Sequence, residues 1–143
     1  RLSYAKKSGA DLIFDPRNTD RRKEVLSSYN GGGPELVVVA TGNVAALQEA
    51  MSALVKVGTL LLCGAPPRDA SLNFEIASFF IRGISLVASY SASEKETNSA
   101  ARMLAESTVR VSDLVTHKFS VDRASDAFAA ARDQKCMKAL VMG

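Results

Sequence analysis

Side chains able to do chemistry are scarce in this sequence. It has one histidine, His117, and two cysteines, Cys63 and Cys136. A zinc site needs about four Cys, His or carboxylate ligands, so a self-contained zinc site and a disulfide framework are both excluded. No Ser/His/Asp set can be assembled around His117, which we interpret as a packed or surface residue. Cys63 ends an apolar run and is predicted to be a small buried hydrophobe, whereas Cys136 has polar neighbours.

Glycine-rich phosphate-binding patterns are absent as well. No G-x-G-x-x-G follows a first strand, and no P-loop pattern occurs. The run Gly31–Pro34 precedes a predicted strand, whereas a phosphate cradle must open the N-terminus of a helix. We therefore interpret Gly31–Pro34 as a turn.

Small, polar and glycine residues follow three apolar runs of the chain. These segments are Thr41–Asn43, Gly64–Pro67 and Ser89–Ser91. In an open α/β sheet, ligands bind beyond the carboxyl ends of the strands. Small residues there let a flat ligand approach the backbone, whose N–H and C=O groups can then recognise it. Three such ends in succession favour a nucleotide-type ligand.

Short apolar runs are predicted to be the strands that position these segments. The runs are continuous rather than alternating and rich in β-branched residues, which is typical of parallel strands buried on both faces. They are Leu12–Phe14, Leu36–Ala40, Thr59–Cys63, Ile84–Ala88 and Met137–Met142. Ser71–Phe74 is a further candidate, as an extra edge segment.

Helical patterns lie between these runs. Residues 44–54 carry one apolar stripe, with Asn43 as the predicted N-cap and Gly58 as the stop. Residues 20–29 form a weaker helical pattern, which Asn30–Pro34 ends.

Two more helices are predicted in the last third of the chain. Ser93 and Glu96 form a capping-box pattern that opens the first, and Asp122 is the predicted cap of the second. Strands and helices that alternate at this spacing indicate right-handed βαβ units. The sequence therefore predicts an α/β fold with a doubly wound parallel sheet.

The composition is that of an ordinary globular protein. Of the 143 residues, 47% are hydrophobic and 23% are charged, which excludes disordered and low-complexity classes. No apolar run approaches the ~18–20 residues that span a bilayer, and no signal peptide is recognised, so we expect a cytoplasmic location and no membrane partner. The net charge is +3, with early basic residues at Arg1, Lys6, Lys7, Arg17, Arg21, Arg22 and Lys23. We interpret them as a solvated helix face, with an anionic ligand as the alternative and no nucleic-acid partner.

Several segments, taken in order along the chain, form a recognisable set. They are Arg1–Asp11, Leu36–Gly42, Gly58–Gly64, Gly83–Tyr90, and Leu114–Val121 leading into Ala124–Phe128. The set resembles the zinc-dependent medium-chain alcohol and polyol dehydrogenases, in particular the sorbitol and threonine dehydrogenase group. The first segment resembles the helix and turn after that family's second Rossmann strand, and the next three resemble its fourth, fifth and sixth strands. The last segment is the most specific match.

The resemblance implies a partial Rossmann fold, a doubly wound parallel sheet that lacks its first βαβ unit, followed by a C-terminal segment. We expect residues 1–88 to be a partial dinucleotide-binding domain and residues 89–143 to return toward an absent catalytic domain. Complete members are much longer, so the chain is expected to be a C-terminal fragment that is inactive alone. Leu12–Phe14 would be strand three without its usual neighbours, so residues 1–30 are expected to be poorly anchored, repacked or completed by another chain.

The resemblance also implies a nicotinamide cofactor, NAD or NADP, and an alcohol or polyol substrate. Zinc would be bound in the full-length enzyme only, by ligands that this chain lacks, and no catalytic residue is assigned here. The expected cofactor-binding residues are Arg1, Ala40, Thr41, Gly42, Cys63, Gly64, Ala65, Ala88, Ser89, Tyr90 and Lys138. Among them, Arg1 would lie near the adenosine and Lys138 near the pyrophosphate.

A homo-oligomer, specifically a dimer, is expected, because Ser71–Phe74 resembles the edge that pairs subunits in the family. One alternative is a zinc-independent quinone or enoyl reductase of the same fold, although Thr116 and His117 favour the zinc branch. The other alternative is a non-enzymatic binding module built on a truncated nucleotide fold.

Overall fold

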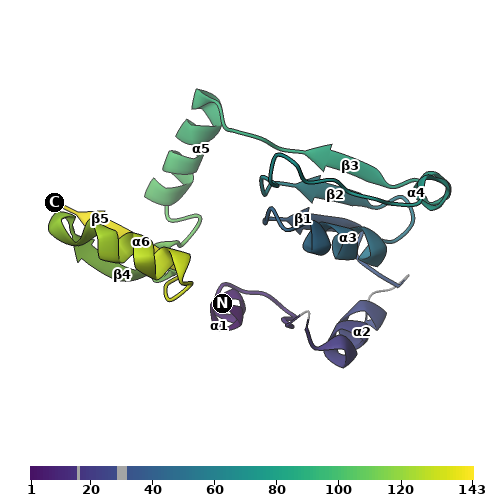
Figure 1. The fold of residues 1–143 in the computed structure, drawn as a ribbon, viewed down its shortest axis with the longest axis horizontal. Coiled ribbons are helices and arrows are strands. Elements are labelled where there is room, and N and C mark those ends of the chain that lie inside the picture. Colours follow the sequence, from purple (N-terminus) through teal and green to yellow (C-terminus); the bar gives the residue numbers. More distant parts are fainter. Residues whose placement is uncertain (16, 29–31) are drawn as a thin grey trace. The chain divides into compact units, whose positions relative to one another are not determined.

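The computed structural model describes residues 1–15, 17–28 and 32–143 (Figure 1). These residues form two compact units, one of Phe14–Ser91 and one of Arg1–Ile13 with Ala92–Gly143. We call them the central unit and the terminal unit and describe each by itself. The expected domain boundary between residues 88 and 89 remains a prediction.

Three of the apolar runs form a parallel sheet in the central unit. Its strands are β1 (Leu36–Val39), β2 (Thr59–Leu62) and β3 (Ser85–Ala88), hydrogen-bonded in that order. Residues at the carboxyl ends are in register, since Val39 pairs with Leu62, which pairs with Ala88. The prediction of these strands is confirmed, and their order matches that of strands four, five and six of a Rossmann sheet.

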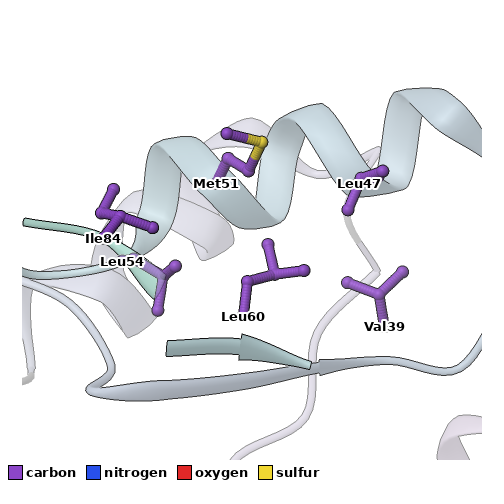
Figure 2. Packing of buried hydrophobic residues seen from close by; sticks show 6 residues of the cluster. All are labelled: Val39, Leu47, Met51, Leu54, Leu60 and Ile84. Atoms are coloured by element: carbon purple, nitrogen blue, oxygen red, sulfur yellow. The ribbon is translucent and has the colours of Figure 1, made fainter. Parts of the chain in front are cut away.

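The core of the central unit lies where helix α3 (Val44–Ala53) covers the sheet. Its buried side chains are Val39, Leu47, Met51, Leu54, Leu60 and Ile84, gathered between α3 and the strands in Figure 2. Leu60 is fully buried, because it lies on the middle strand beneath the helix. Burying one leucine side chain stabilises a fold by about 1.5–3 kcal/mol, so this cluster anchors the sheet to α3.

The predicted start of α3 is confirmed, and its predicted stop is wrong. The side chain of Asn43 caps the helix by accepting hydrogen bonds from the backbone N–H groups of Ala45 and Ala46, at 2.8 and 3.4 Å. The helix ends at Ala53, well before Gly58, because Leu54 turns to an extended conformation and enters the core. Gly58 instead precedes β2, where a Cβ would lie 3.0 Å from the Leu54 side chain.

Two further helices belong to the central unit. Helix α2 (Thr19–Ser27) confirms the weak helical pattern of residues 20–29, although residues 29–31 of the predicted helix end and turn lie outside the described residues. Helix α4 (Ile76–Arg82) was not predicted, because its apolar residues form no one-sided stripe in the sequence. In the structure, apolar side chains of this helix such as Phe80 are exposed. The Arg82 guanidinium donates to the carbonyls of Met51 and Leu54 and so ties α4 to the end of α3.

Two expected strand segments are not strands. Leu12–Phe14 has no strand conformation, and among the described residues β1 pairs with β2 alone. A strand is stable only beside a hydrogen-bonded neighbour, and the sheet places none next to Leu12–Phe14. Ser71–Phe74 is also irregular; it is held instead by the ring of Phe74, whose centroid lies 5.0 Å from that of Phe79.

The terminal unit contains a second, separate sheet. Strands β4 (Val115–Ser120) and β5 (Lys138–Met142) pair in parallel, and helix α6 (Ala124–Arg132) connects and contacts both. The prediction of a strand at 137–142 is confirmed, but the strand belongs to this sheet and not to that of β1–β3. Ala127 and Cys136 are buried here. Helix α1 (Leu2–Lys7) agrees with the helix expected from the resemblance of Arg1–Asp11.

Of the two helix caps predicted in the terminal unit, one is confirmed and the other is wrong. Ser93 and Glu96 form the predicted capping box at the start of α5 (Glu94–Ala105), with the Ser93 N–H donating to Glu96 at 2.9 Å. Asp122 does not cap α6, because it lies within a 3-10 turn, η2 (Val121–Arg123), that runs directly into the helix.

The early basic residues are exposed where the structure describes their side chains. Arg17 forms an ion pair with Asp15 at 2.5 Å, and the ammonium of Lys7 lies over the Tyr4 ring at 5.7 Å. The side chains of Arg21 and Arg22 lie outside the described part. Within the described residues, none of the helices has the length and apolar character needed to cross a membrane.

Candidate functional site

The carboxyl ends of β1, β2 and β3 meet at one edge of the central sheet. Nine predicted site residues lie at these strand ends or directly after them: Ala40, Thr41, Gly42, Cys63, Gly64, Ala65, Ala88, Ser89 and Tyr90. The strands are parallel, adjacent and in even register, so the three segments leave the sheet side by side. The structure therefore brings these nine residues together, while their role in binding a ligand remains a prediction.

The first two of these segments are joined backbone to backbone. A Cβ on Gly42 would lie 2.1 Å from the carbonyl oxygen of Ala65, and a Cβ on Gly64 would lie 2.1 Å from the carbonyl carbon of Thr41. The Val39 carbonyl accepts hydrogen bonds from the N–H groups of Cys63 and Gly64, both at 3.0 Å. These glycines are thus required by the contact between the two loops. Sequence reasoning missed the part of Val39, because a backbone carbonyl carries no residue-type signal.

Exposed groups of modest polarity line this edge. The Thr41 hydroxyl accepts a hydrogen bond from the N–H of Asn43 at 3.3 Å, and the N–H of Ser89 donates to the carbonyl of Leu62 at 2.9 Å. Tyr90 is 89% exposed. Cys63 is exposed too, so the prediction that it is buried is wrong. The reason is its position just past the last residue of β2, where the side chain leaves the covered part of the sheet.

Two other predicted site residues, Arg1 and Lys138, lie in the terminal unit. Both line one depression of about 340 Å³, together with apolar residues that include Phe128 and Met137. Cys136, also at this depression, is buried despite its polar neighbours in sequence. The predicted site residues therefore form two sets, nine at the central edge and two cations in the terminal unit.

His117 has no geometry for acid–base catalysis. Its side chain is exposed on β4, with Nδ1 3.0 Å from the Thr116 hydroxyl and the ring stacked 6.3 Å from that of Phe119. The Thr116 hydroxyl also accepts the N–H of Met137 at 3.0 Å. The interpretation of His117 as a packed or surface residue is confirmed.

Carboxyl groups with lowered pKa values are not among the residues at the carboxyl ends of β1, β2 and β3. Hydrogen bonds from the side chain and backbone of Arg17 lower the pKa of Asp15 to about 2. A hydrogen bond from the Ser93 side chain lowers the pKa of Glu96, and one from Ser120 lowers that of Asp122. All three are exposed turn or cap interactions, so they indicate local structure and not an acid–base site.

The described side chains of this chain are not arranged to hold zinc. Across residues 1–15, 17–28 and 32–143, no three His, Cys, Asp or Glu residues gather closely enough to hold a metal ion. No step of a reaction is therefore assigned to a metal held here.

Comparisons with known proteins agree with this arrangement of strands. The chain is 27% identical to L-threonine 3-dehydrogenase from Pyrococcus furiosus and 29% identical to sorbitol dehydrogenase from Halalkalibacterium halodurans; each match covers 99% of this chain and 41% of the relative. An alcohol dehydrogenase from Escherichia coli CFT073, solved in complex with NADH, matches at a TM-score of 0.82 and 20% identity, over 98% of this chain and 40% of that one. The fold is thus a partial Rossmann fold, and the chain spans about two fifths of the length of these proteins. Because the family model of zinc-binding dehydrogenases matches residues 1–106, this chain belongs to that family.

Proposed function

We propose that this chain supplies part of the nicotinamide-cofactor site of a zinc-dependent dehydrogenase that oxidises an alcohol or polyol. The observation that carries the proposal is the shared edge of β1, β2 and β3, where nine small or exposed residues lie together. When bound, the nicotinamide would accept a hydride from the carbinol carbon of the substrate. In this proposal zinc is held by residues outside this chain.

The residues at the edge would bind and orient the ring. The joined loops at 40–42 and 63–65 present backbone and small side chains, against which a flat ring can lie. Backbone groups of Cys63–Ala65 and Ala88–Tyr90 would meet the carboxamide and fix which face of the ring is turned to the substrate. Their contribution is orientation and exclusion of water, which raises the rate of transfer without any acid or base.

The two cations of the terminal unit would bind the anionic part of the cofactor. Arg1 and Lys138 line the same depression, which supports a shared ligand. A guanidinium and an ammonium are suited to phosphate oxygens. NAD and NADP both carry the pyrophosphate, so this pair does not choose between them.

We propose a homo-oligomer, supported by β3, which pairs with β2 alone among the described residues, and by the exposed apolar side chains of Ile76, Phe80 and Ile81 on α4. A cytoplasmic location is proposed as well. Sedimentation analysis of the chain tests the first, with a single monomeric species as the opposing result.

The binding test uses two serines at opposite ends of β3. Ser89 follows the carboxyl end and Ser85 begins the strand, and both are exposed. The variant Ser89→Glu places a larger anionic side chain at the proposed ring site, and Ser85→Glu makes the same change at the other end. NADH is titrated into the full chain, whose lack of tryptophan leaves the cofactor's own fluorescence undisturbed by indole. Ser89→Glu is expected to weaken NADH binding by roughly tenfold or more, and Ser85→Glu by less than about twofold.

Four outcomes would oppose the proposal. NADH that fails to bind the unaltered chain, or that binds equally well to both variants, contradicts a site at this edge. Turnover of sorbitol by this chain alone contradicts the placement of the catalytic apparatus elsewhere. Binding without turnover by the chain, and turnover of quinones instead of polyols by a longer form containing it, would favour the zinc-independent reductase.

A further inference from the structure

We propose that Gly42 and Gly64 are positioning residues, which lock the loops after β1 and β2 into one preformed platform and leave the end of β3 as the adjustable side of the site. The inference rests on the proposed function for the meaning of the platform. The lock itself is a property of the backbone and is argued from contacts alone. We call residues 39–42 and 63–66 the two locked loops.

The lock is reciprocal. At Gly42 a Cβ would lie 2.1 Å from the Ala65 carbonyl oxygen and 3.2 Å from the Cα of Pro66. At Gly64 a Cβ would lie 2.1 Å from the carbonyl carbon of Thr41 and 2.4 Å from its nitrogen. Real Cβ atoms do not come within 3.0 Å of such atoms, so each glycine is required by the backbone of the other loop. Neither loop can shift without the other, because both contacts are made by backbone.

Backbone conformation does not explain these two glycines. The glycines with left-handed φ in the described chain are Gly9, Gly32 and Gly83, and neither Gly42 nor Gly64 is among them. A glycine kept for the approach of a ligand would have its α-hydrogens facing open space, as at Gly9. At Gly42 and Gly64 that space is filled by the neighbouring loop, so the requirement exists before any ligand binds.

Hydrogen bonds extend the lock to α3. The Val39 carbonyl accepts from both Cys63 and Gly64, which fixes the second loop to the end of β1. The Thr41 hydroxyl accepts the N–H of Asn43, and the Asn43 side chain caps α3. The two locked loops are therefore continuous with the covered core, which gives them the rigidity that an orienting surface needs.

The end of β3 lies outside this lock. After the bond from Ser89 to Leu62, neither Tyr90 nor Ser91 makes a backbone hydrogen bond in the part of the chain that the structure describes. Ser91 has a φ of 65°, a left-handed conformation that is strained for a residue with a Cβ. The strained backbone at Ser91 and the lack of backbone hydrogen bonds at Tyr90 and Ser91 make this the segment that rearranges most easily.

The experiment measures amide hydrogen exchange in the full chain without cofactor. Gly64→Ala is expected to speed exchange at least tenfold in both locked loops, including residues 39–42, which it does not alter. The matched control is Gly58→Ala at the other end of β2, where a Cβ would also be crowded, at 3.0 Å from Leu54 and Val55. It is expected to leave the locked loops unchanged. If Gly64→Ala does not fold, Gly42→Ala is used in its place and is expected to speed exchange in both locked loops. The unaltered chain provides a second test, since it is expected to show slow exchange at Cys63 and Gly64 and fast exchange at Tyr90 and Ser91.

Addition of NADH then tests the platform. The proposal expects exchange to change most at residues 88–91. In the two locked loops, slowing is expected only at the backbone groups that meet the ring. An effect of Gly64→Ala confined to its own loop, or fast exchange at Cys63 and Gly64 in the unaltered chain, overturns the lock. Failure of NADH to bind opposes the proposed function instead, and the exchange measured without cofactor still tests the lock separately.

Discussion

The central and terminal units fill their interiors to very different degrees. In the central unit α3 covers a three-stranded sheet and buries a cluster that includes Leu47, Met51 and the fully buried Leu60. In the terminal unit α6 lies on two strands, and the buried hydrophobic residues are Ala127 and Cys136, both small. Helix α5 has no buried residue at all. Since apolar burial is the main source of stability, the central unit carries its own fold while the terminal unit depends more on local interactions.

The two units also differ in what stabilises their helices. Both α3 and α5 have side-chain caps, Asn43 and Ser93. Helix α3 adds tertiary burial to its cap, whereas α5 has the cap and its own hydrogen bonds. Short helices are marginal in water without packing, so the cap should matter more in α5.

The largest expected effect is the loss of core in the central unit. Leu60→Ala should cost about 2–5 kcal/mol, because it removes a fully buried side chain and leaves a cavity. Leu140→Ala on β5 of the terminal unit, where the side chain is 41% exposed, should cost less than about 1 kcal/mol. Hydrogen exchange resolved by unit measures both. Equal losses would contradict the contrast between the units.

An intermediate effect is expected from the cysteines. Cys136→Ser places a hydroxyl at a buried position of the terminal unit and should cost about 1–3 kcal/mol there. Cys63→Ser, at an exposed position, should stay within about 0.5 kcal/mol. A thiol reagent should modify Cys63 in the folded chain, and it should modify Cys136 only after the terminal unit unfolds locally. Rapid modification of both thiols would show that the terminal unit has no closed interior.

The smallest effect is expected at the cap of α5 and depends on pH. The Ser93 hydrogen bond lowers the pKa of Glu96, so the folded state binds this proton less readily than the unfolded state. The stabilisation by this carboxylate is therefore present above its unfolded pKa and is lost as the pH falls through the lower folded pKa. Ser93→Ala should weaken the helix by about 1 kcal/mol and return the pKa of Glu96 toward its ordinary value. Carbon-13 NMR of the Glu96 carboxyl group measures the shift.

The matched change in the central unit is Asn43→Ala. It removes the two hydrogen bonds to Ala45 and Ala46, but α3 keeps its buried face. We expect amide exchange to rise in the first turn of α3 only, whereas Ser93→Ala should raise it along much of α5. Fraying of equal extent in both helices would show that packing does not distinguish them.

The parts of the fold predicted correctly are those in which local pattern and burial agree. The runs at 36–40, 59–63 and 84–88 are continuous and β-branched, and each forms a parallel strand. Asn43 and the pair Ser93 and Glu96 cap helices because their side chains reach backbone N–H groups within one turn, an interaction that needs no distant residue. The nine residues of the candidate site lie at the ends of these runs, so the prediction of the strands also located them at one edge of the sheet.

The errors fall where a distant neighbour decides. Leu12–Phe14 is as apolar as a strand but has no strand beside it. Val115–Ser120 contains both half-buried and exposed residues and was not predicted as a strand, yet it forms β4 because β5 lies beside it. Asp122 has a cap-forming side chain but occupies a 3-10 turn. Burial of the two thiols is the reverse of what their sequence neighbours suggest, because burial depends on what packs over a residue.

The amino-acid sequence by itself determined the three strands of the central sheet, two helix starts and the small residues that follow each strand, since hydrophobic pattern and capping act over a few neighbouring residues. Tertiary structure alone decided that β5 belongs to a second sheet, that Cys63 is exposed while Cys136 is buried, and that Gly42 and Gly64 meet the backbone of each other's loop. The physical reason is that pairing, burial and steric contact are relations between segments distant in the chain. No window of neighbouring residues contains them.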